Sequence, residues 1–393
     1  NLDIRIAIQQ VAAAEAYMKQ GKAGYLPTLN AKATATHQEL AKNSQFGQVF
    51  SGSVEQFEVS AGLSWEADIW GKIRSTKRAS DATYLQSRAA QQAVKTELIS
   101  QIAGTYYQLL ALDEQGKITE ETIQNRKTTL ETMQVLKDAG NVNQVAVDGA
   151  AAQLYNAQAL LIDIKKNTFR TENIFAILLG RPAQQLDRGE LDQQSLDTDL
   201  AIGLPSQLLR NRPDVMEAEY NLVNAFELTN VAKTEFYPSL TISATGGYQS
   251  LGFSQLFDAG SLFATLIGGL TQPIFNKRQI KTKYEVAQAQ KEQSLLNFEK
   301  TLLLAGQEVS NALYEHEAET EKYEYLIKEV EALRRAEANS EELLDNGFGT
   351  YLDLLAARQN ALNAELNVIE NKLQQLQTVV DLYRALGGGW STP

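Results

Sequence analysis

Few side chains of this sequence stand in patterns that could carry chemistry. His316 lies in Tyr-Glu-His-Glu-Ala-Glu, where the flanking carboxylates could help to bind a metal ion, although a solvated helix face explains the same pattern. Glu66 and Asp68 are spaced like a general acid and base, but Lys72 and Arg74 follow closely and could be their ion-pair partners. No nucleophile, metal cluster or phosphate-binding loop is visible. The sequence therefore predicts neither an enzyme nor a metal or cofactor site.

Asp353 is the carboxylate with the most informative position. It follows the break at 346–350 (Asn-Gly-Phe-Gly-Thr), where a helical pattern stops and restarts. A carboxylate at a helix start satisfies free backbone amides, because the positive end of the helix dipole lies there. In a threefold assembly, three copies of Asp353 would also form a ring of negative charge that favours cations. The two roles are compatible, and the sequence leaves both open.

The elements that must position such residues occur twice, about 207 residues apart. Gly140 recurs as Gly347, and Leu179-Gly180 recurs as Leu386-Gly387. Each copy runs in the same order: an alternating stretch, a turn region, a second alternating stretch and two long helical stretches. A register shared over so much of the chain indicates an internal duplication.

Composition limits the possible classes of protein. The chain has 393 residues, 44% of them hydrophobic, with no cysteine and a formal net charge of −12. The lack of cysteine excludes disulfides and thiolate metal sites, and the acidic balance argues against nucleic-acid binding, which needs a basic surface. No run approaches the ~18 apolar residues of a transmembrane helix. The first residues already follow a helical pattern, which indicates a processed or trimmed start.

Four stretches, at about 28–38, 57–68, 239–248 and 262–272, alternate apolar and polar side chains. Such alternation predicts strands with one apolar and one polar face. We expect the apolar face to meet lipid through Leu29, Val59, Leu63, Leu240, Ile242 and Leu266. We expect the polar face to line a water-filled lumen through Lys32, Ser60, Thr241 and Ser243.

A soluble sandwich would show the same alternation, but two features favour a membrane sheet. The stretches match the ~9–11 residues that a tilted strand needs to cross a bilayer. The loops at 43–53 and 253–261 are polar and carry phenylalanines, like external loops beside an aromatic girdle. Four strands cannot close a barrel, and an open edge in hydrocarbon leaves backbone groups unpaired. The chain must therefore oligomerise: two copies would supply eight strands, and three would supply twelve and leave a pore.

Long helical stretches follow each pair of strands. Residues 76–137 and 281–342 contain no proline and are rich in good helix formers. About 60 helical residues would span ~90 Å. Residues 352–383 repeat apolar side chains at alternating spacings of three and four, which is typical of a coiled-coil seam. The glycine-containing breaks at 139–143 and 346–350 should be the tips of helical hairpins.

Three motifs together resemble those of the TolC-like family of outer-membrane efflux proteins, in the branch that serves multidrug and metal resistance pumps. Residues 204–215 (Leu-Pro-Ser-Gln-Leu-Leu-Arg-Asn-Arg-Pro-Asp-Val) resemble the inter-repeat signature of this family. Residues 64–72 (Ser-Trp-Glu-Ala-Asp-Ile-Trp-Gly-Lys) resemble its strand-to-helix junction, with 271–275 as the second-copy partner. Residues 382–390 resemble its carboxyl end. The resemblance covers nearly the whole chain.

The resemblance implies a mainly α-helical, duplicated protein with a membrane β-barrel portion. It implies a homotrimer with a twelve-stranded barrel in the outer membrane of a Gram-negative bacterium, an α-barrel of helical hairpins in the periplasm and a mixed equatorial belt. Such a protein contacts outer-membrane lipid, a periplasmic adaptor protein and an inner-membrane pump, and is the passive exit duct for drugs or metal ions. Two alternatives stay open: a type I protein-secretion duct of the same architecture, and a coiled-coil scaffold without a channel, against which the amphipathic strands argue.

The expected organisation assigns a role to each segment. In the first repeat, we expect the first membrane β-hairpin at 28–68 with external loop 43–53, and the first tunnel helices at 72–180 with a tip near 139–145. We expect an inter-repeat equatorial segment at 181–215 and a helix leading into the second repeat at 216–237. In the second repeat, we expect the second membrane β-hairpin at 238–275 with external loop 253–261, and the second tunnel helices at 280–387 with a tip near 346–353.

The resemblance also implies a periplasmic gate at the two tips. The candidate gate residues are Asn143, Gln144, Thr350, Tyr351 and Asp353. Many relatives carry a second carboxylate about one turn after the first, where this chain has Ala356, which weakens the expected acidic gate. Relatives in this branch also often carry a longer amino-terminal segment that begins with a lipidated cysteine, a segment that this sequence does not contain.

Overall fold

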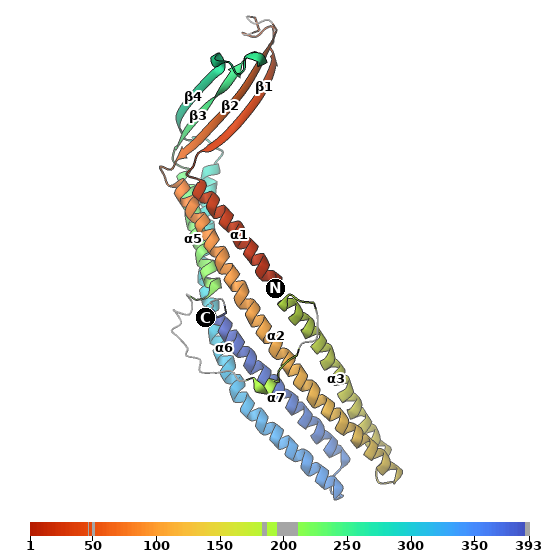
Figure 1. Ribbon diagram of the computed structural model, residues 1–393. Helices are drawn as coiled ribbons and strands as arrows, with labels where there is room; N and C mark the ends of the chain where they lie inside the picture. Colours follow the sequence, from red (N-terminus) through yellow and green to blue (C-terminus); the bar gives the residue numbers. More distant parts are fainter. Residues whose placement is uncertain (46, 49–51, 183–186, 195–210, 390–393) are drawn as a thin grey trace. The chain divides into compact units, whose positions relative to one another are not determined.

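The structure is a computed structural model that describes residues 1–45, 47–48, 52–182, 187–194 and 211–389 (Figure 1). The chain forms two compact units. The tip unit comprises Asn1–Ile8, Ala89–Met216 and Lys300–Pro393, and the sheet unit comprises Gln9–Arg88 and Glu217–Glu299. Each unit therefore takes segments from both halves of the duplicated sequence.

The sheet unit contains one antiparallel sheet with the strand order β1-β2-β3-β4. The strands are β1 (Thr28–Glu39), β2 (Ser53–Ala67), β3 (Ser239–Ser250) and β4 (Leu262–Thr271). The four predicted strands are confirmed, although β2 begins four residues earlier than the 57–68 stretch and ends before Asp68. β1 and β4 each pair on one side only, so the sheet has two free edges.

The register places the predicted apolar residues on one face of the sheet. Leu29 pairs with Leu63, Leu63 with Ala244 and Ala244 with Leu266, so these residues form one row across all four strands. Residues that lie directly opposite in a ladder share a face, and neighbours along a strand alternate. Val59, Leu240 and Ile242 lie on this same face by alternation, whereas Lys32, Ser60, Thr241 and Ser243 lie on the other.

Two helical hairpins of nearly equal size make up most of the chain. They are α2 (Lys72–Asp138) with α3 (Gln144–Leu179), and α6 (Gln279–Asp345) with α7 (Tyr351–Ala385), of 67, 36, 67 and 35 residues. The matching lengths confirm the predicted duplication and the mainly helical fold. The shorter elements are α1 (Leu2–Ala23), α5 (Pro213–Thr234), and the 3-10 turns η1 (Leu191–Gln193), η2 (Phe253–Gln255) and η3 (Ala259–Ser261).

The apolar seam predicted for 352–383 is the buried face of α7. Leu355, Leu362, Ile369, Leu373 and Leu376 are all buried. The last three of these pack against Leu110 of α2 and Leu191 of η1. The two ends of the predicted seam, Leu352 and Tyr383, are exposed in the single chain. The seam therefore holds α7 to the first hairpin along its middle, where the apolar side chains face a partner.

Arg212 anchors the start of α5. Residues 204–210 of the signature at 204–215 lie outside the described residues. Pro213 is the first residue of α5 and Asp214 lies in its first turn, where a proline and an acidic residue both favour a helix start. The buried guanidinium of Arg212 donates to Asp214 at 2.6 Å, to Glu308 of α6 at 2.8 Å and to the carbonyl of Ala385 in α7 at 3.1 Å. This arginine links the inter-repeat segment to both helices of the second hairpin.

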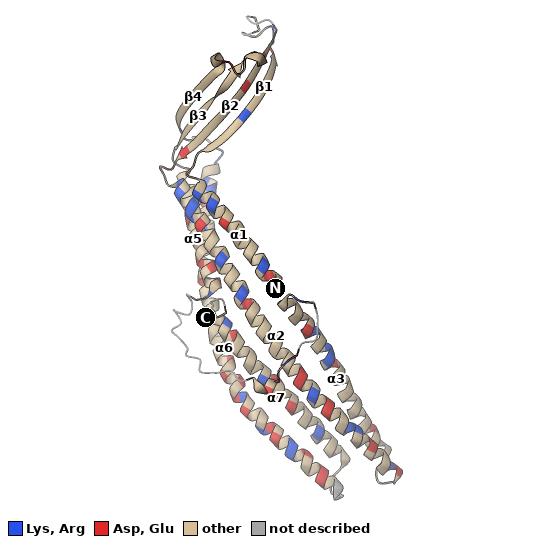
Figure 2. Cartoon of the chain, viewed as in Figure 1, with Lys and Arg blue, Asp and Glu red and all other residues tan. Residues whose placement is uncertain are grey.

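Charged side chains are abundant on the helices and rare on the strands (Figure 2). β3 and β4 contain none, and β1 and β2 contain Lys32, Glu39, Glu55, Glu58 and Glu66. None of the described helices combines the length and the apolar character needed to cross a membrane.

Candidate functional site

The turns at the two hairpin tips define the position of the candidate site. Gly140, between α2 and α3, and Gly347, between α6 and α7, have φ values of 79° and 76°. Glycine adopts this left-handed conformation without the steric cost of a side chain. Asn143 caps α3, since its side-chain oxygen accepts the N–H of Ala146 at 3.2 Å. Both helical stops therefore have a local cause in the sequence.

Thr350 and Asp353 form a reciprocal cap at the start of α7. The Asp353 N–H donates to the Thr350 hydroxyl oxygen at 3.3 Å, and the Thr350 N–H donates to the Asp353 carboxylate at 3.3 Å. The Thr350 hydroxyl also donates to that carboxylate, at 2.6 Å. Asp353 is thus a helix-start residue, and its exposed side chain leaves the carboxylate open to the surroundings.

Tyr351 lies in an apolar cluster that joins the two hairpins. It is buried with Met133 of α2, Val147 of α3 and Leu354 and Leu355 of α7. Among the described residues its buried hydroxyl has no hydrogen-bond partner. Burial raises the pKa of this hydroxyl, and the nearby Arg358 only partly opposes the shift. The ring thus provides apolar contact between the hairpins, and its hydroxyl stays protonated.

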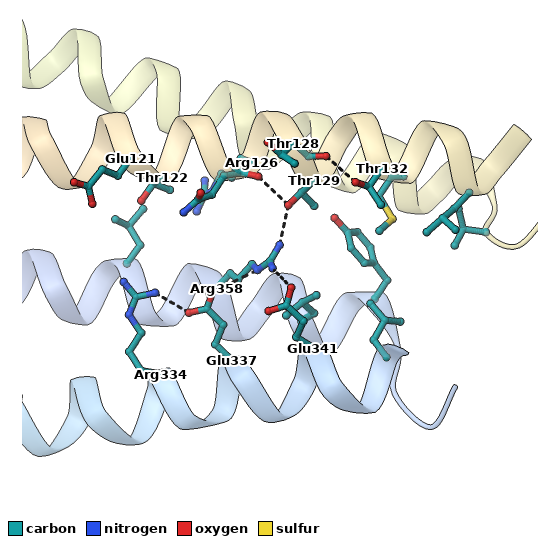
Figure 3. A pocket seen from close by; sticks show the side chains of 18 of the residues that line it. Glu121, Thr122, Arg126, Thr128, Thr129, Thr132, Arg334, Glu337, Glu341 and Arg358 are labelled. Atoms are coloured by element: carbon teal, nitrogen blue, oxygen red, sulfur yellow. Dashed lines mark hydrogen bonds and ion pairs between the residues drawn. The ribbon is translucent and has the colours of Figure 1, made fainter. Parts of the chain in front are cut away.

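A groove next to this cluster runs between α2, α6 and α7 and has a volume of about 1110 Å³ (Figure 3). Arg358 of α7 reaches across it toward α2. Its Nη1 donates to the hydroxyl of Thr129 in α2 at 2.8 Å, and its Nη2 donates to Glu341 of α6 at 2.8 Å. Its Nε lies 3.4 Å from Glu337 of α6. One guanidinium of α7 therefore contacts two other helices, α2 and α6, at the tip.

Arg126 of α2 is buried in the same groove. Its Nη1 donates to the Gln153 carbonyl of α3 at 2.6 Å, and its Nη2 donates to the Gln359 side chain of α7 at 3.0 Å. Within the described part of the chain, its buried Nε has no partner. Burial and the positive charge of Arg358 lower the pKa of Arg126. Arg126 and Arg358 thus lie close together in the groove, and no carboxylate among the described residues bonds to the more buried Arg126.

Carboxylates compensate the other arginines of the groove. Arg334 of α6 bonds to Glu337 at 2.9 Å and, through Nε, to Glu365 of α7 at 2.6 Å. Burial disfavours the charged form of Arg334, but the two glutamates outweigh it and raise the pKa. These ion pairs, like those of Arg358, join α6 to itself or to α7. The groove therefore holds its charge pairs within the second hairpin.

The bonds that cross from one hairpin to the other are of a different kind. Among the described residues in and beside the groove they are Arg358 to the Thr129 hydroxyl, Arg126 to the Gln359 side chain, and the Gln153 side chain to the Leu355 carbonyl at 3.1 Å. Each has a neutral acceptor. A hydrogen bond of this class contributes about 0.5–1.5 kcal/mol, and up to about 3 kcal/mol when one partner is charged. At the tip the two hairpins are therefore held together by hydrogen bonds that can break without separating an ion pair, whereas far from the tip Arg384 of α7 and Glu97 of α2 form an ion pair at 3.8 Å.

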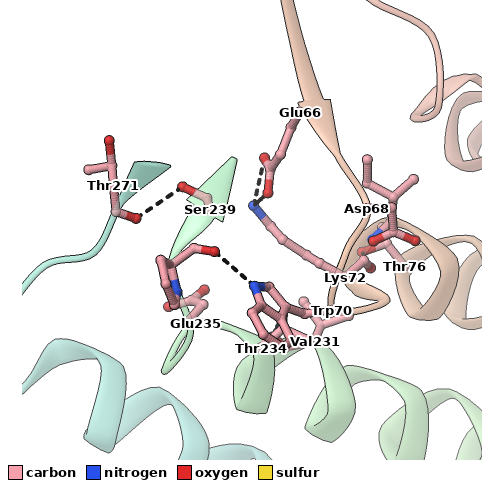
Figure 4. Close-up of polar contacts among 12 residues, drawn as sticks. Glu66, Asp68, Trp70, Lys72, Thr76, Val231, Thr234, Glu235, Ser239 and Thr271 are labelled. Atoms are coloured by element: carbon pink, nitrogen blue, oxygen red, sulfur yellow. Dashed lines mark hydrogen bonds and ion pairs between the residues drawn. The ribbon is translucent and has the colours of Figure 1, made fainter. Parts of the chain in front are cut away.

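A second set of polar contacts lies where the strands meet the helices (Figure 4). Lys72 donates to both carboxylate oxygens of Glu66, at 3.0 and 3.1 Å. Asp68 lies beyond the strand and accepts the backbone N–H groups of Ile73 and Arg74, at 2.8 and 2.9 Å. Both acidic residues therefore have structural partners, and Asp68 satisfies the amino end of α2 rather than the side chain of Arg74.

The structure brings the predicted gate residues to the tips of the hairpins, whereas His316 lies elsewhere. Asn143, Thr350, Tyr351 and Asp353 all lie at the tips of the hairpins. Gln144 donates to Asp148 of its own helix at 2.8 Å. His316 bonds to Thr378 of α7 at 3.3 Å. The described residues contain no group of three or more His, Asp or Glu side chains close enough to share a metal ion.

Sequence reasoning missed the arginines of the groove. Arg126 lies in a polar stretch of α2 that reads as an exposed helix face, and Arg358 directly precedes a seam position of α7. Their partners lie on helices that are distant in the sequence, so the local spacing of residues does not predict these hydrogen bonds and ion pairs. The one usable signal was a long charged residue beside an apolar seam, close to the predicted tip.

Comparison with known proteins gives consistent matches over nearly the whole chain. The family model described as outer membrane efflux protein matches residues 1–181 and 204–388. The chain is 29% identical to the antibiotic efflux pump outer membrane protein ArpC of Pseudomonas putida over 394 aligned positions, which cover 99% of this chain and 81% of ArpC. It is 26% identical to the cation efflux system protein CusC of Escherichia coli, over 99% of this chain and 84% of CusC. The solved structure of the outer-membrane channel OprN superposes with a TM-score of 0.92 at 26% identity, covering 99% of this chain and 88% of OprN.

Proposed function

The chain belongs to the family of outer membrane efflux proteins, and we propose that it is the passive exit duct of a tripartite efflux system, with its gate at the helical tips. Membership of this family locates the protein in the outer membrane of a Gram-negative bacterium and assigns it to efflux. The observation that supports a gate at the tips is that the three hydrogen bonds between the hairpins in the groove all have neutral acceptors and lie beside the apolar cluster of Tyr351.

The proposed cargo is a small molecule, either a drug or a metal cation. ArpC is an antibiotic efflux protein and CusC a cation efflux protein, and this chain is similar to both over nearly its full length. The same matches favour efflux over the type I secretion of proteins. A scaffold without a channel is disfavoured by the amphipathic sheet, whose apolar face would have no partner in such a protein.

The two free edges of the sheet support a closed homotrimer. Backbone groups left unpaired in hydrocarbon cost several kcal/mol each, so β1 of one chain must pair with β4 of the next. Three chains give twelve strands, enough for an open lumen. The apolar face (Leu29, Val59, Leu63, Leu240, Ile242 and Leu266) then meets outer-membrane lipid, and the polar face (Lys32, Ser60, Thr241 and Ser243) lines the lumen.

The proposed gate opens when the second hairpin moves away from the first. Its internal ion pairs, Arg358 with Glu337 and Glu341, keep the hairpin together during this motion, while the bond to Thr129 breaks. Asp353 lies at the same tip, where threefold symmetry brings three exposed carboxylates to the pore mouth. Contacts with a periplasmic adaptor protein, itself coupled to an inner-membrane pump, would stabilise the open arrangement.

Single-channel recording in planar bilayers tests this function. The full-length protein, purified in detergent, should insert as a trimer and show a small resting conductance that is cation-selective. Chemical cross-linking in detergent checks the trimer independently. Protein that inserts as a monomer, or that never conducts in any lipid, would contradict the proposed duct.

A further inference from the structure

Exposed apolar residues occupy all four junctions between the sheet and its helices. Each junction has a pair of adjacent apolar residues, and each pair contains at least one aromatic side chain. The pairs, with their exposed fractions, are Tyr25 42% and Leu26 68%, Ile69 53% and Trp70 48%, Phe236 45% and Tyr237 44%, and Ile274 85% and Phe275 97%. Some of these rings contact another aromatic ring, but the apolar surface that they leave exposed is what a membrane or another apolar partner would cover.

Hydrogen bonds hold two tryptophan rings at the junctions, Trp70 and the neighbouring Trp65, in fixed positions. Trp70 stacks on Tyr237 with 4.8 Å between ring centroids, and its Nε1 donates to the Pro238 carbonyl at 2.8 Å. Nε1 of Trp65 donates to the Tyr25 carbonyl at 3.0 Å. Rigid rings with a bonded polar edge and an exposed apolar face are typical of the headgroup level of a membrane.

Basic side chains are concentrated next to these rings. The segments 19–27, 68–78, 233–238 and 272–283 contain eleven Lys and Arg against two Asp and Glu, a net charge of +9 in a chain whose net charge is −12. Some of these cations pair with carboxylates further along the helices, such as Arg278 with Glu285 at 3.0 Å. Five have no carboxylate partner among the residues that the structure describes: Lys22, Arg74, Lys77, Lys233 and Lys277.

The turn before α6 presents both features at once. Lys277 and Arg278 have φ values of 53° and 65°, a left-handed conformation that non-glycine residues rarely adopt. Only Asn276 separates them from the almost fully exposed Ile274 and Phe275. Backbone strain of this kind persists where the surrounding structure or a bound partner makes use of it. The turn thus displays an apolar pair and two cations side by side.

We infer that these four segments, named here the junction collar, bind the phosphate groups of anionic phospholipids in the periplasmic leaflet of the outer membrane. The inference rests on the proposed function, because only a membrane-inserted sheet brings the junctions to a headgroup layer. The apolar face of the sheet ends at the rows of Trp65 and Ala67, and the exposed rings follow directly. Lys72 lies within the collar but bonds to Glu66 on the polar face, so it does not contribute a free cation to the lipid side.

Brominated lipids provide a direct test, because bromine quenches tryptophan fluorescence at short range. Of the three tryptophans of this sequence, Trp65 and Trp70 lie in or beside the collar, and the third is removed by Trp390→Phe. The full-length protein with this substitution is reconstituted in equimolar phosphatidylcholine and phosphatidylglycerol, with bromine on the acyl chains of one lipid or of the other. We expect phosphatidylglycerol to be enriched about fivefold near the rings, and high salt to reduce the enrichment.

Two charge-matched variants separate the collar from general electrostatics. The collar variant carries Lys22→Gln, Arg74→Gln, Lys77→Gln and Lys277→Gln, and the control carries Lys127→Gln, Lys137→Gln, Arg170→Gln and Lys300→Gln in the tip unit. The collar variant should quench equally with either brominated lipid, whereas the control should keep the preference. Equal quenching in the parent protein, or an equal loss in both variants, would overturn the inference. Single-channel conductance of the parent in the same lipids tests the duct separately.

Discussion

Arg358 of α7 and Thr129 of α2 are joined by a hydrogen bond of 2.8 Å that crosses from one helical hairpin to the other. The other nitrogens of the Arg358 guanidinium contact Glu341 and Glu337 of α6, within its own hairpin. Arg358 is therefore bound to the second hairpin by two ion pairs and to the first hairpin by a single hydrogen bond. Such a division suits a gate that moves one hairpin as a body.

The first prediction concerns this bond. Thr129→Val keeps the shape of the side chain but removes the acceptor, so the closed state should lose about 1 kcal/mol and the ratio of open to closed channels should rise roughly fivefold. Single-channel recording in a planar bilayer measures this as a higher resting conductance. Thr128→Val is the matched control, because the Thr128 hydroxyl bonds to the Gln124 carbonyl of its own helix. Equal behaviour of the two variants would count against the gate.

The second prediction separates the two roles of Asp353. Asp353→Asn keeps a side-chain oxygen that can accept at the helix start but removes the charge, so cation selectivity should fall while stability changes little. Thr350→Ala removes the cap without changing the charge, so it should cost about 1 kcal/mol and leave selectivity unchanged. Reversal potentials in a salt gradient and thermal unfolding measure the two effects. If Asp353→Asn conducts like the parent, the residue is only a helix-start residue.

The third prediction concerns Tyr351, whose ring packs against residues of both hairpins. Tyr351→Ala leaves a cavity in this cluster, so it should destabilise the tip by roughly 3 kcal/mol and raise the resting conductance. Tyr351→Phe keeps the ring and removes a buried hydroxyl that has no partner in the described chain, so both properties should stay close to the parent. A Phe variant that conducts like the Ala variant would assign the effect to the hydroxyl instead.

The fourth prediction tests which face of the sheet meets lipid. Leu266 and Thr265 are neighbours on β4 and point to opposite faces. Leu266→Arg should cost ~2–4 kcal/mol if it lies near the bilayer midplane, whereas Thr265→Arg, on the polar face, should cost much less. Denaturant unfolding from lipid vesicles measures both. A larger penalty for Thr265→Arg would mean that the faces are assigned the wrong way round.

The fifth prediction concerns the pH dependence of the Arg212 anchor. Burial tends to raise the pKa of Asp214, but its bonds with Arg212 outweigh burial and hold the pKa below its usual range. A carboxylate with a depressed pKa stabilises the fold above its unfolded value near pH 3.9, and the contribution is lost as the pH falls through the folded pKa. Asp214→Asn should therefore lower stability by about 1 kcal/mol at pH 7 and have no effect in strong acid. Melting curves of the detergent-solubilised protein across pH test this, with Glu131→Gln of α2 as the control; a deficit that persists in strong acid would exclude a charge effect.

The strands and hairpins could be predicted because their causes are local. Alternation fixes the two faces of β1 to β4, and Gly140 and Gly347 stop the helices where their φ values require glycine. The groove could not be predicted in the same way. Gln359 and Arg126 are joined over 233 positions, and the partners of Arg358 lie on two other helices. Helical periodicity identifies a buried stripe, but it does not say which distant polar group completes it.

The pairing of β2 with β3 has a consequence for biogenesis. Ala67, the last residue of β2, pairs with Leu240 of β3, which belongs to the second copy of the duplicated unit. These two residues are 173 positions apart in the sequence. Ladders that close such long loops form late, since the entropy of closure must be overcome before the contacts form. The sheet cannot be completed on a nascent chain until the second copy has been delivered. Until then the apolar face and the free edge of the first β-hairpin stay uncovered, so this hairpin is the segment most exposed to aggregation before the sheet is complete.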